Sequence, residues 1–226
     1  MAFNSGSDTP NFSPDGRLLQ IEYAIEAVRL GSTIIGVKND SCAVLVLEKR
    51  RENNLIDEYG VQKLIRFQPK IGCGISGLTS DARFLIEKAR IFLENHVFNF
   101  YKTPSVEGCA KKIRELISSA FSGQKEEFGV SRPPGAAFLL CGLDSKGIHL
   151  FQIDPTGDST SQEIAALGGG FKESNFVIRE GYRKNMSTEE TKKLAIKALR
   201  VIMEKNVDER NFELGVIDSQ KKGIFN

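Results

Sequence analysis

The residue of this 226-residue sequence whose setting most directly suggests chemistry is Ser32, which follows Gly31 and opens an apolar run. A glycine before a small hydroxyl residue at a strand start is where self-processing amidohydrolases cut themselves to expose a nucleophile. Such a nucleophile uses its own free α-amine as the base, so the residues before it must be removed. Glu48 ends the next predicted strand and Lys63 follows in the second strand pair, so an acid and a lysine are expected to approach Ser32. Spacing alone does not distinguish this nucleophile from an ordinary strand-start residue.

Two glycine-rich stretches are further candidate binding sites. GCGISG, residues 72–77, matches the GxGxxG pattern of dinucleotide-binding turns, and Glu94 follows at about the distance of a ribose-binding acid. In a dinucleotide-binding fold that acid ends a strand, whereas Glu94 lies within an unbroken helical pattern from Asp81 to Phe100. LGGGF, residues 167–171, lacks the Lys-Ser/Thr pair of a P-loop. We interpret the first stretch as a glycine-rich strand with close backbone approach and the second as a strand-to-helix turn.

The charge pattern and the cysteines exclude other classes of function. The 31 basic and 29 acidic residues are mixed along the chain, without the basic run of a nucleic-acid or membrane surface. Residues 1–16 have neither a basic start nor an apolar segment, so no signal peptide is expected. The four cysteines lie far apart, and His96 and His149 sit in a helical and a strand pattern. This spacing favours buried free thiols in a reducing compartment, and we expect no metal and no cofactor.

Hydrophobic periodicity predicts the elements that position these residues. A helix is predicted over residues 16–30, with SPDG at its start and Gly31 as its stop. Two helices follow residue 77, and two more follow residue 167, the second opened by Ser187 and Glu190 in capping-box spacing. The predicted strands are 32–37, 42–48, 63–67, 71–76, 136–142, 147–153, 163–167, 212–217 and 223–225.

Strands and helices therefore alternate in blocks along the chain. The stretches AVLVL (43–47) and AAFLLC (136–141) lack polar alternation, so both of their faces are expected to be covered. Paired long helices cover the outer faces of one sheet or of two stacked sheets. The pattern predicts layered α/β structure without a linker or repeat, and leaves the number of sheets open.

The stretch FSPDGRLLQIEYAIEAVRLGST, residues 12–33, resembles the signature opening of proteasome alpha-type subunits. The likeness continues through GVQKLIRF, SGLTSDAR, SRPPGAAFLL and QIDPTG, and is greatest to the type-five alpha subunit. The resemblance implies an α+β fold, the four-layer αββα sandwich of two antiparallel sheets of N-terminal nucleophile hydrolases, with an extra N-terminal helix. It implies a single domain over 1–226, with a flexible gate tail at 1–15, the helix at 16–31 and the sandwich at 32–226.

The resemblance also implies that the chain is not catalytic. Alpha subunits keep the segment that beta subunits cleave off, and its helix packs across the top of the sandwich. Ser32 falls where a beta subunit places its threonine, but it stays acylated by Gly31, and Glu48 replaces the aspartate expected beside that nucleophile. The alternatives are a self-processing serine hydrolase cleaved between Gly31 and Ser32, and a nucleotide-binding oxidoreductase that uses residues 72–77.

By the same resemblance, seven alpha subunits form the outer ring of the 20S proteasome, stacked on a beta ring that carries the proteolytic threonines. The chain would be a structural and gating subunit in ubiquitin-dependent and ubiquitin-independent protein degradation, in the cytoplasm and nucleus. The implied partners are other alpha subunits, beta subunits and regulatory particles, but neither nucleic acid nor membrane. Ring contacts would come from the helix at 16–30, the loops around 50–60 and the helix from Asp81.

The resemblance implies a docking site as well. In this family the C-terminal tails of activators enter pockets between neighbouring alpha subunits, where a lysine meets the tail carboxylate. Lys63 matches that lysine, and Leu18, Gly31 and Leu78 match positions in the pocket wall.

A gate is the last implied feature. Family members usually carry a Tyr-Asp-Arg motif whose Tyr and Asp join a proline and a second tyrosine to hold the gate open. Pro14 and Tyr23 match the latter two positions. The preceding segment MAFNSGSDTPN has no tyrosine and no arginine, so we expect this tail to contribute less than its neighbours to the ordered open gate.

Overall fold

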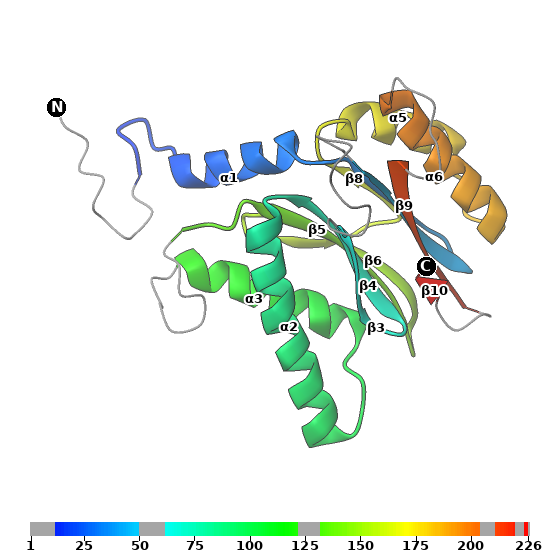
Figure 1. Cartoon of the computed structure of the whole chain (residues 1–226), viewed down its shortest axis with the longest axis horizontal. Helices are drawn as coiled ribbons and strands as arrows, with labels where there is room; N and C mark the ends of the chain where they lie inside the picture. The colour runs from blue at the N-terminus through cyan, green and yellow to red at the C-terminus, as the bar shows by residue number, and fades with distance from the viewer. Residues whose placement is uncertain (1–11, 50–61, 122–131, 204–210, 220–223, 226) are drawn as a thin grey trace, which may run out of the picture.

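Two antiparallel sheets, stacked face to face and covered by helices on both outer sides, form the body of the protein (Figure 1). The computed structural model describes residues 12–49, 62–121, 132–203, 211–219 and 224–225. Within these residues, each strand pair is antiparallel. The architecture confirms the αββα sandwich with an N-terminal helix, and it differs from the parallel sheet that a dinucleotide-binding fold requires.

The first sheet has the strand order β10-β9-β2-β1-β8, and the second has the order β3-β4-β5-β6-β7. The strands of the first sheet are β1 (Ile34–Lys38), β2 (Cys42–Glu48), β8 (Ile164–Leu167), β9 (Phe212–Asp218) and β10 (Ile224–Phe225). The strands of the second sheet are β3 (Leu64–Gln68), β4 (Ile71–Gly77), β5 (Ala136–Asp144), β6 (Gly147–Ile153) and β7 (Ser159–Ser161).

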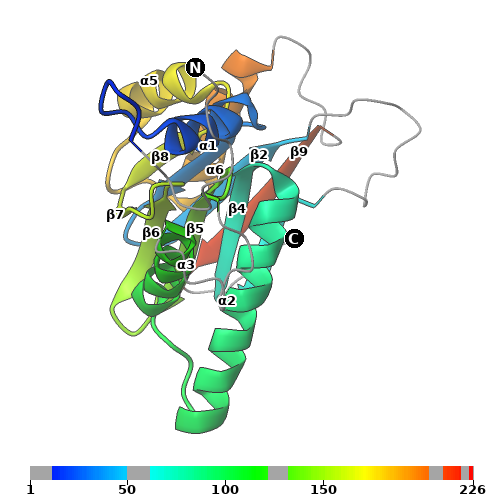
Figure 2. The same cartoon turned by 90° about the vertical axis from the view of Figure 1, so that its left-hand side faces the viewer.

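Two helix pairs cover the sheets, and a single helix lies at their end. The helices are α1 (Leu19–Leu30), α2 (Thr79–Phe100), α3 (Val106–Phe121), α5 (Phe171–Gly181) and α6 (Thr188–Ile202). The pair α5 and α6 packs on the first sheet, and α2 and α3 pack on the second (Figures 1 and 2). The single helix α1 lies across the end of the sandwich, against β4 and β5. This placement joins α1 directly to the start of β1.

The central strands are buried on both faces, as their unbroken apolar sequences predicted. In β2, Leu45 and Leu47 belong to the core between the sheets, whereas Val44 and Val46 belong to the core under α5 and α6. Successive side chains of a strand point to opposite faces, so a strand between two cores needs apolar residues at every position. The same alternation places Phe138 of β5 against α2 and α3.

The glycine-rich stretch 72–77 forms β4 and is no nucleotide-binding turn. A Cβ at Gly74 would lie 3.0 Å from Ile34 Cγ2 and 3.1 Å from Leu47 Cδ2, side chains that reach across from the first sheet. Glycine therefore lets large residues of the opposite sheet approach this strand closely. The interpretation of the stretch as a glycine-rich strand is confirmed.

The helix predicted from residue 16 begins at Leu19, so the predicted start was wrong. The chain is first tied back on itself, because the Ser13 N–H donates to the Arg17 carbonyl over 2.8 Å and the Arg17 N–H donates to Ser13 Oγ over 3.0 Å. This turn keeps residues 13–17 out of the helix. Strand β7 was not predicted either, because its sequence, Ser-Thr-Ser, carries no apolar signal.

The capping box predicted at the start of α6 is present. The Glu190 N–H donates to Ser187 Oγ over 3.3 Å, and the Ser187 N–H donates to Glu190 Oε2 over 2.7 Å. The predictions for the gate tail before residue 12 and for the loops around 50–60 lie outside the described residues. The description of the chain as one domain stays a prediction.

Candidate functional site

The junction between α1 and β1 brings Ser32 and Lys63 together. Lys63 Nζ donates a hydrogen bond to Ser32 Oγ over 2.5 Å. Ser32 exposes only 2% of its surface, and Lys63 is half-buried just before β3. Glu48 reaches the same point, since its Oε2 accepts a hydrogen bond from the Thr33 N–H over 3.0 Å. The lysine of the predicted pair therefore contacts Ser32 itself, and the acid binds the neighbouring Thr33.

Hydrogen bonds hold the backbone on both sides of Ser32. The hydroxyl of the buried Ser76 lies 3.0 Å from the Ser32 carbonyl oxygen and 3.2 Å from that of Val28, so one donor bridges β1 and α1. The Gly31 carbonyl accepts a hydrogen bond from the Gly169 N–H over 3.1 Å. The end of α1 and the start of β1 are therefore fixed relative to each other.

Two glycines make this close packing possible. A Cβ at Gly31 would lie 2.4 Å from the Gly77 nitrogen and 2.7 Å from Ser76 Oγ. Gly168 has a φ of +93°, and a Cβ there would lie 2.4 Å from the Ser32 carbonyl oxygen. Neither position has room for a side chain, so backbones meet directly around Ser32.

The arrangement contains some of the parts of a hydrolase. A serine hydroxyl beside a lysine is a nucleophile–base pair in Ser–Lys hydrolases. An N-terminal nucleophile instead uses its α-amine, and the Ser32 nitrogen is an amide for as long as Gly31 is attached. Ser32 is also almost fully enclosed, so a substrate carbonyl has no open path to Oγ in this arrangement.

Three of the four predicted pocket residues lie near one another. Gly31 is next to Ser32, the partner of Lys63, and a Cβ at Gly31 would approach the nitrogen of Gly77, which precedes Leu78. Leu78 is 46% exposed. Leu18 lies at the opposite end of α1, roughly 18 Å away along a helix of 12 residues. Within this chain, Leu18 is therefore separated from Gly31 by the length of α1.

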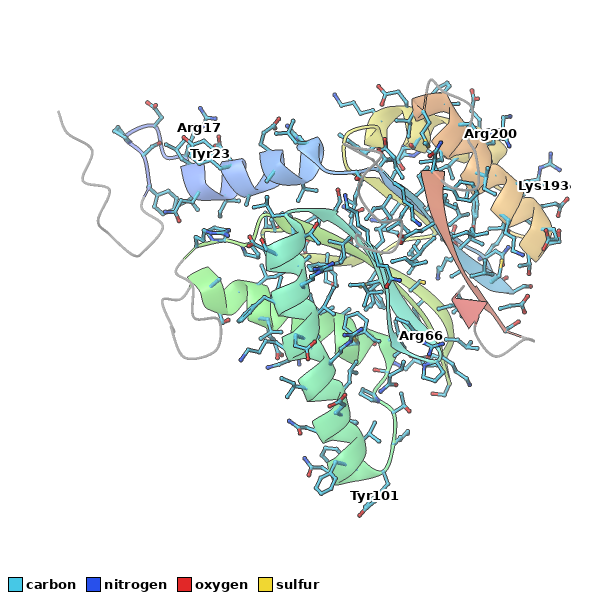
Figure 3. All side chains as sticks on the ribbon, viewed as in Figure 1. Arg17, Tyr23, Arg66, Tyr101, Lys193 and Arg200 are labelled. Carbon is cyan, nitrogen blue, oxygen red and sulfur yellow. The ribbon has the colours of Figure 1, made fainter. Side chains whose placement is uncertain are left out.

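The residues predicted for the gate lie at the start of α1. Pro14 occupies the second position of a turn in which the Gly16 N–H donates to the Ser13 carbonyl over 2.9 Å. Proline at this position and glycine at the fourth are typical of β-turns. Tyr23 is 67% exposed on α1, close to the Arg17 side chain, which pairs with Glu22 (Figure 3).

The histidines and cysteines have structural surroundings. His96 packs against Phe100, with ring centroids 4.7 Å apart, and His149 Nε2 lies 3.0 Å from Asp144 Oδ1. The four cysteines are buried and free, as predicted, and burial raises the pKa of Cys109 to about 12. Among the described residues, no three His, Cys, Asp or Glu side chains gather as metal ligands. No helix of that same part of the chain has the length and apolar character to cross a membrane.

An ion pair that was not predicted from the sequence is linked by hydrogen bonds to Leu78, a residue of the predicted pocket. Arg132 donates to both carboxylate oxygens of Asp81, over 2.6 and 2.8 Å, and the Gly135 N–H donates to Asp81 Oδ2 over 3.0 Å. The Gly135 carbonyl in turn accepts from the Leu78 N–H over 2.8 Å. Arg132 belongs to the motif SRPPG, which is visible in the sequence. Its partner Asp81 lies 51 residues away, so the sequence alone does not pair the two.

The pKa of Asp81 reflects this clamp. Burial alone would raise the pKa of the carboxyl group, but the hydrogen bonds from Arg132 and from the Gly135 N–H outweigh burial and lower it. A lowered pKa in the folded state stabilises the protein above the pKa of the unfolded chain, and that stabilisation is lost as the pH falls through the folded value.

Comparison with known proteins assigns these features to a family. The family model described as Proteasome subunit matches residues 28–217, and the model for the N-terminal signature of A-type proteasome subunits matches residues 7–27. The chain belongs to the proteasome subunit family. The signature match ends within α1, so the alpha-type signature includes the turn at Pro14 and most of the helix that precedes Ser32.

Named relatives within this proteasome family extend the match over most of the chain. It is 40% identical to the probable proteasome alpha type-5 subunit of Schizosaccharomyces pombe, over 92% of this chain and 85% of that protein. It is 37% identical to the proteasome alpha type-5 subunit of Trypanosoma brucei brucei, over 91% and 84%. It is 36% identical to the proteasome alpha subunit of Methanopyrus kandleri, over 92% and 83%. The resemblance to alpha-type subunits, including type five, is confirmed.

We predict that Arg132→Gln lowers the free energy of unfolding by roughly 1–2 kcal/mol near pH 7, because the partly buried Asp81 carboxylate loses its charged partner. The difference from the unchanged protein should shrink below about pH 3.9, the ordinary value for aspartate, as Asp81 becomes protonated. Urea denaturation at several pH values measures this. Arg17→Gln, which breaks the exposed pair with Glu22, is the matched control and should leave stability almost unchanged, because solvent screens that pair. A pH-independent difference would contradict the prediction.

Proposed function

We propose that this chain is a non-catalytic structural subunit of the alpha ring of a 20S proteasome, where it supports ring assembly, gating and the docking of regulatory particles. The main support for this proposal is the junction of α1 and β1. Ser32 is buried there, and a peptide bond connects it to a helix that packs on the sandwich. A disposable propeptide needs no such packing. Ubiquitin-dependent and ubiquitin-independent degradation would be activities of the assembled particle, and its location in cytoplasm and nucleus stays a prediction.

Exposed apolar side chains support a role in a ring. On α1, Leu30 is 72% exposed, and on α2, Phe98 and Phe100 are 79% and 67% exposed. Exposed apolar residues mark sites of protein association where they lie close together, as Phe98 and Phe100 do in the last turn of α2. We propose that α1 and α2 contact neighbouring alpha or beta subunits through these residues.

The second candidate function is the self-processing serine hydrolase, which the Lys63–Ser32 hydrogen bond favours. The two functions differ in the fate of the peptide bond between Gly31 and Ser32. In the hydrolase this bond is cleaved and Ser32 gains a free amine, whereas in the scaffold it stays intact.

We predict that the chain isolated from the assembled particle retains residues 2–31, and that Ser32→Ala leaves peptide hydrolysis by the particle unchanged. The reason is that the Ser32 nitrogen remains an amide and cannot act as a base. Intact-mass measurement of the chain and a peptide hydrolysis assay test the two parts. A mature chain that begins at Ser32 would refute the proposed function.

Lys63 is proposed to bind the carboxylate of an activator tail. An ammonium group that donates to a neutral hydroxyl is able to exchange that acceptor for a carboxylate, since the carboxylate adds the attraction of an opposite charge. The exposed Leu78 and the glycine at position 31 would form the adjoining wall. Leu18 of the neighbouring subunit would complete it.

We predict that Lys63→Met, which keeps the apolar stem, weakens tail binding to this pocket by about 1.5–3 kcal/mol, because the carboxylate loses a charge-assisted hydrogen bond. Activation of the particle should fall less, because other pockets of the ring share the regulator. Ser32→Ala is the matched control, as it removes the same hydrogen bond but keeps the ammonium group. Equal weakening by both variants would assign the effect to packing and not to the charge of Lys63.

Pro14 and Tyr23 are proposed to take part in the gate, with Pro14 fixing the turn that aims the preceding segment.

Deleting residues 2–9 should raise basal peptide hydrolysis by the particle less than deletion of its main gating tail does. The physical reason is that a segment of Gly, Ser, Asp and Asn has little apolar surface to bury against its neighbours. Basal hydrolysis by the two deletion particles, measured side by side, provides the test. A rise as large as that of the main gating tail would show that this segment is a principal closing element.

A further inference from the structure

A hollow of about 450 Å³ lies between α2 and β3, which is an edge strand of the second sheet. Arg66 of β3 and Arg83 and Arg90 of α2 line it, together with one acid, Glu87. Figure 3 shows Arg66 at the edge of the sheet. Leu64 and Ile86 supply apolar lining, and Ile86 is only 2% exposed. We name this site the β3–α2 hollow.

The positive charge of the β3–α2 hollow is only partly compensated. Arg90 is engaged by the protein itself, since it donates to the Arg66 carbonyl over 3.3 Å and lies 3.6 Å from Glu87 Oε2. Throughout the described ranges, the guanidinium groups of Arg66 and Arg83 make no hydrogen bond or ion pair. Three guanidinium groups and one carboxylate leave an excess of two positive charges in a concave site.

Local structure decides which side chains line the hollow. Positions 83, 86, 87 and 90 of α2 fall on one helical face, which is the face turned to β3. The backbone edge of β3 is partly occupied, because the Leu64 N–H donates to Glu213 Oε2 over 2.8 Å and Arg90 binds the Arg66 carbonyl. A partner is therefore expected to bind here through its side chains and not as an added strand.

We propose that the β3–α2 hollow binds an acidic segment of a protein partner, with Arg66 and Arg83 pairing with its carboxylates. The planar guanidinium group matches a carboxylate with two parallel hydrogen bonds. The half-buried Leu64 in the lining suits the methylene stem of a Glu side chain. The volume corresponds to roughly fifteen water molecules, which is more than one small anion fills.

This site is separate from the proposed tail pocket. Lys63, Gly31 and Leu78 do not line the β3–α2 hollow. A tail needs one terminal carboxylate, whereas this hollow offers two guanidinium groups that pair with none of the described residues. The inference does not rest on the proposed function, and either one can fail without the other.

Fluorescence anisotropy of a labelled, end-blocked tetraglutamate peptide, titrated with the full chain, tests the proposal. We expect Arg66→Gln/Arg83→Gln to raise Kd at least about tenfold, equivalent to about 1.4 kcal/mol. The matched control is Arg179→Gln/Arg200→Gln, which removes two exposed arginines from α5 and α6. It should change Kd by less than about twofold. Arg66→Lys/Arg83→Lys, which keeps the charge but loses the fork geometry, should fall between these values.

Three results would overturn the proposal. An equal loss of peptide affinity in the two double-glutamine variants would show that only the net charge of the chain matters for binding. Equal binding of an end-blocked tetraglutamine peptide would remove the role of the carboxylates. Displacement of the peptide by an equimolar amount of inorganic phosphate would identify a free-anion site in place of a protein-binding one. Thermal melting of each variant checks folding, and the two ligand comparisons use only the unchanged chain.

Discussion

The direct contact of backbones at the end of α1 is the constraint on which the rest of the site depends. Gly31 meets the Gly77 nitrogen where a Cβ would come within 2.4 Å, and Gly77 meets the Gly135 carbonyl oxygen where a Cβ would come within 2.2 Å. Three segments distant in sequence are thus stacked without side chains between them. Ser76 adds a hydroxyl that bridges the carbonyls of α1 and β1. Any side chain at this stack would push α1 off the sandwich, and with it the residue that precedes Ser32.

The same constraint explains why a hydrolase-like pair is combined with an enclosed backbone. Strand pairing between β3 and β4, together with the position of α1 over β4, brings Lys63 to Ser32. Glu48 is brought in by its register on β2, where its N–H and carboxylate bind both backbone groups of Thr33. These contacts follow from the sandwich itself. These contacts can serve N-terminal nucleophile chemistry only if Ser32 has a free amine. As long as the peptide bond from Gly31 is intact, the Ser32 nitrogen is an amide.

Much of this organisation was accessible from the sequence, and the exceptions have physical reasons. The unbroken apolar runs of β2 and β5 predicted strands between two cores, and the alternation of Leu45 and Val46 between those cores explains why. The predicted start of α1 was wrong because a hydrogen bond from the Arg17 N–H to Ser13 Oγ determines the local conformation there. Hydrophobic periodicity gives no information on such a contact. The clamp between Asp81 and Arg132 joins residues 51 positions apart, so no local pattern encodes it. The number of sheets needed the family resemblance, since helix pairs cover one sheet or two equally well.

Lys63 shows how a contact inherited from the fold is able to serve docking. Its ammonium group donates a hydrogen bond to the neutral hydroxyl of Ser32, whereas the carboxylate of a tail would add the attraction of an opposite charge to such a hydrogen bond. Exchange of the hydroxyl for a carboxylate would therefore favour docking. Ser32 would meanwhile hold the long lysine side chain in a narrow set of rotamers, which reduces the entropy lost on binding. On the proposed function, Ser32, which occupies the position of a nucleophile, instead positions the Lys63 ammonium group for docking.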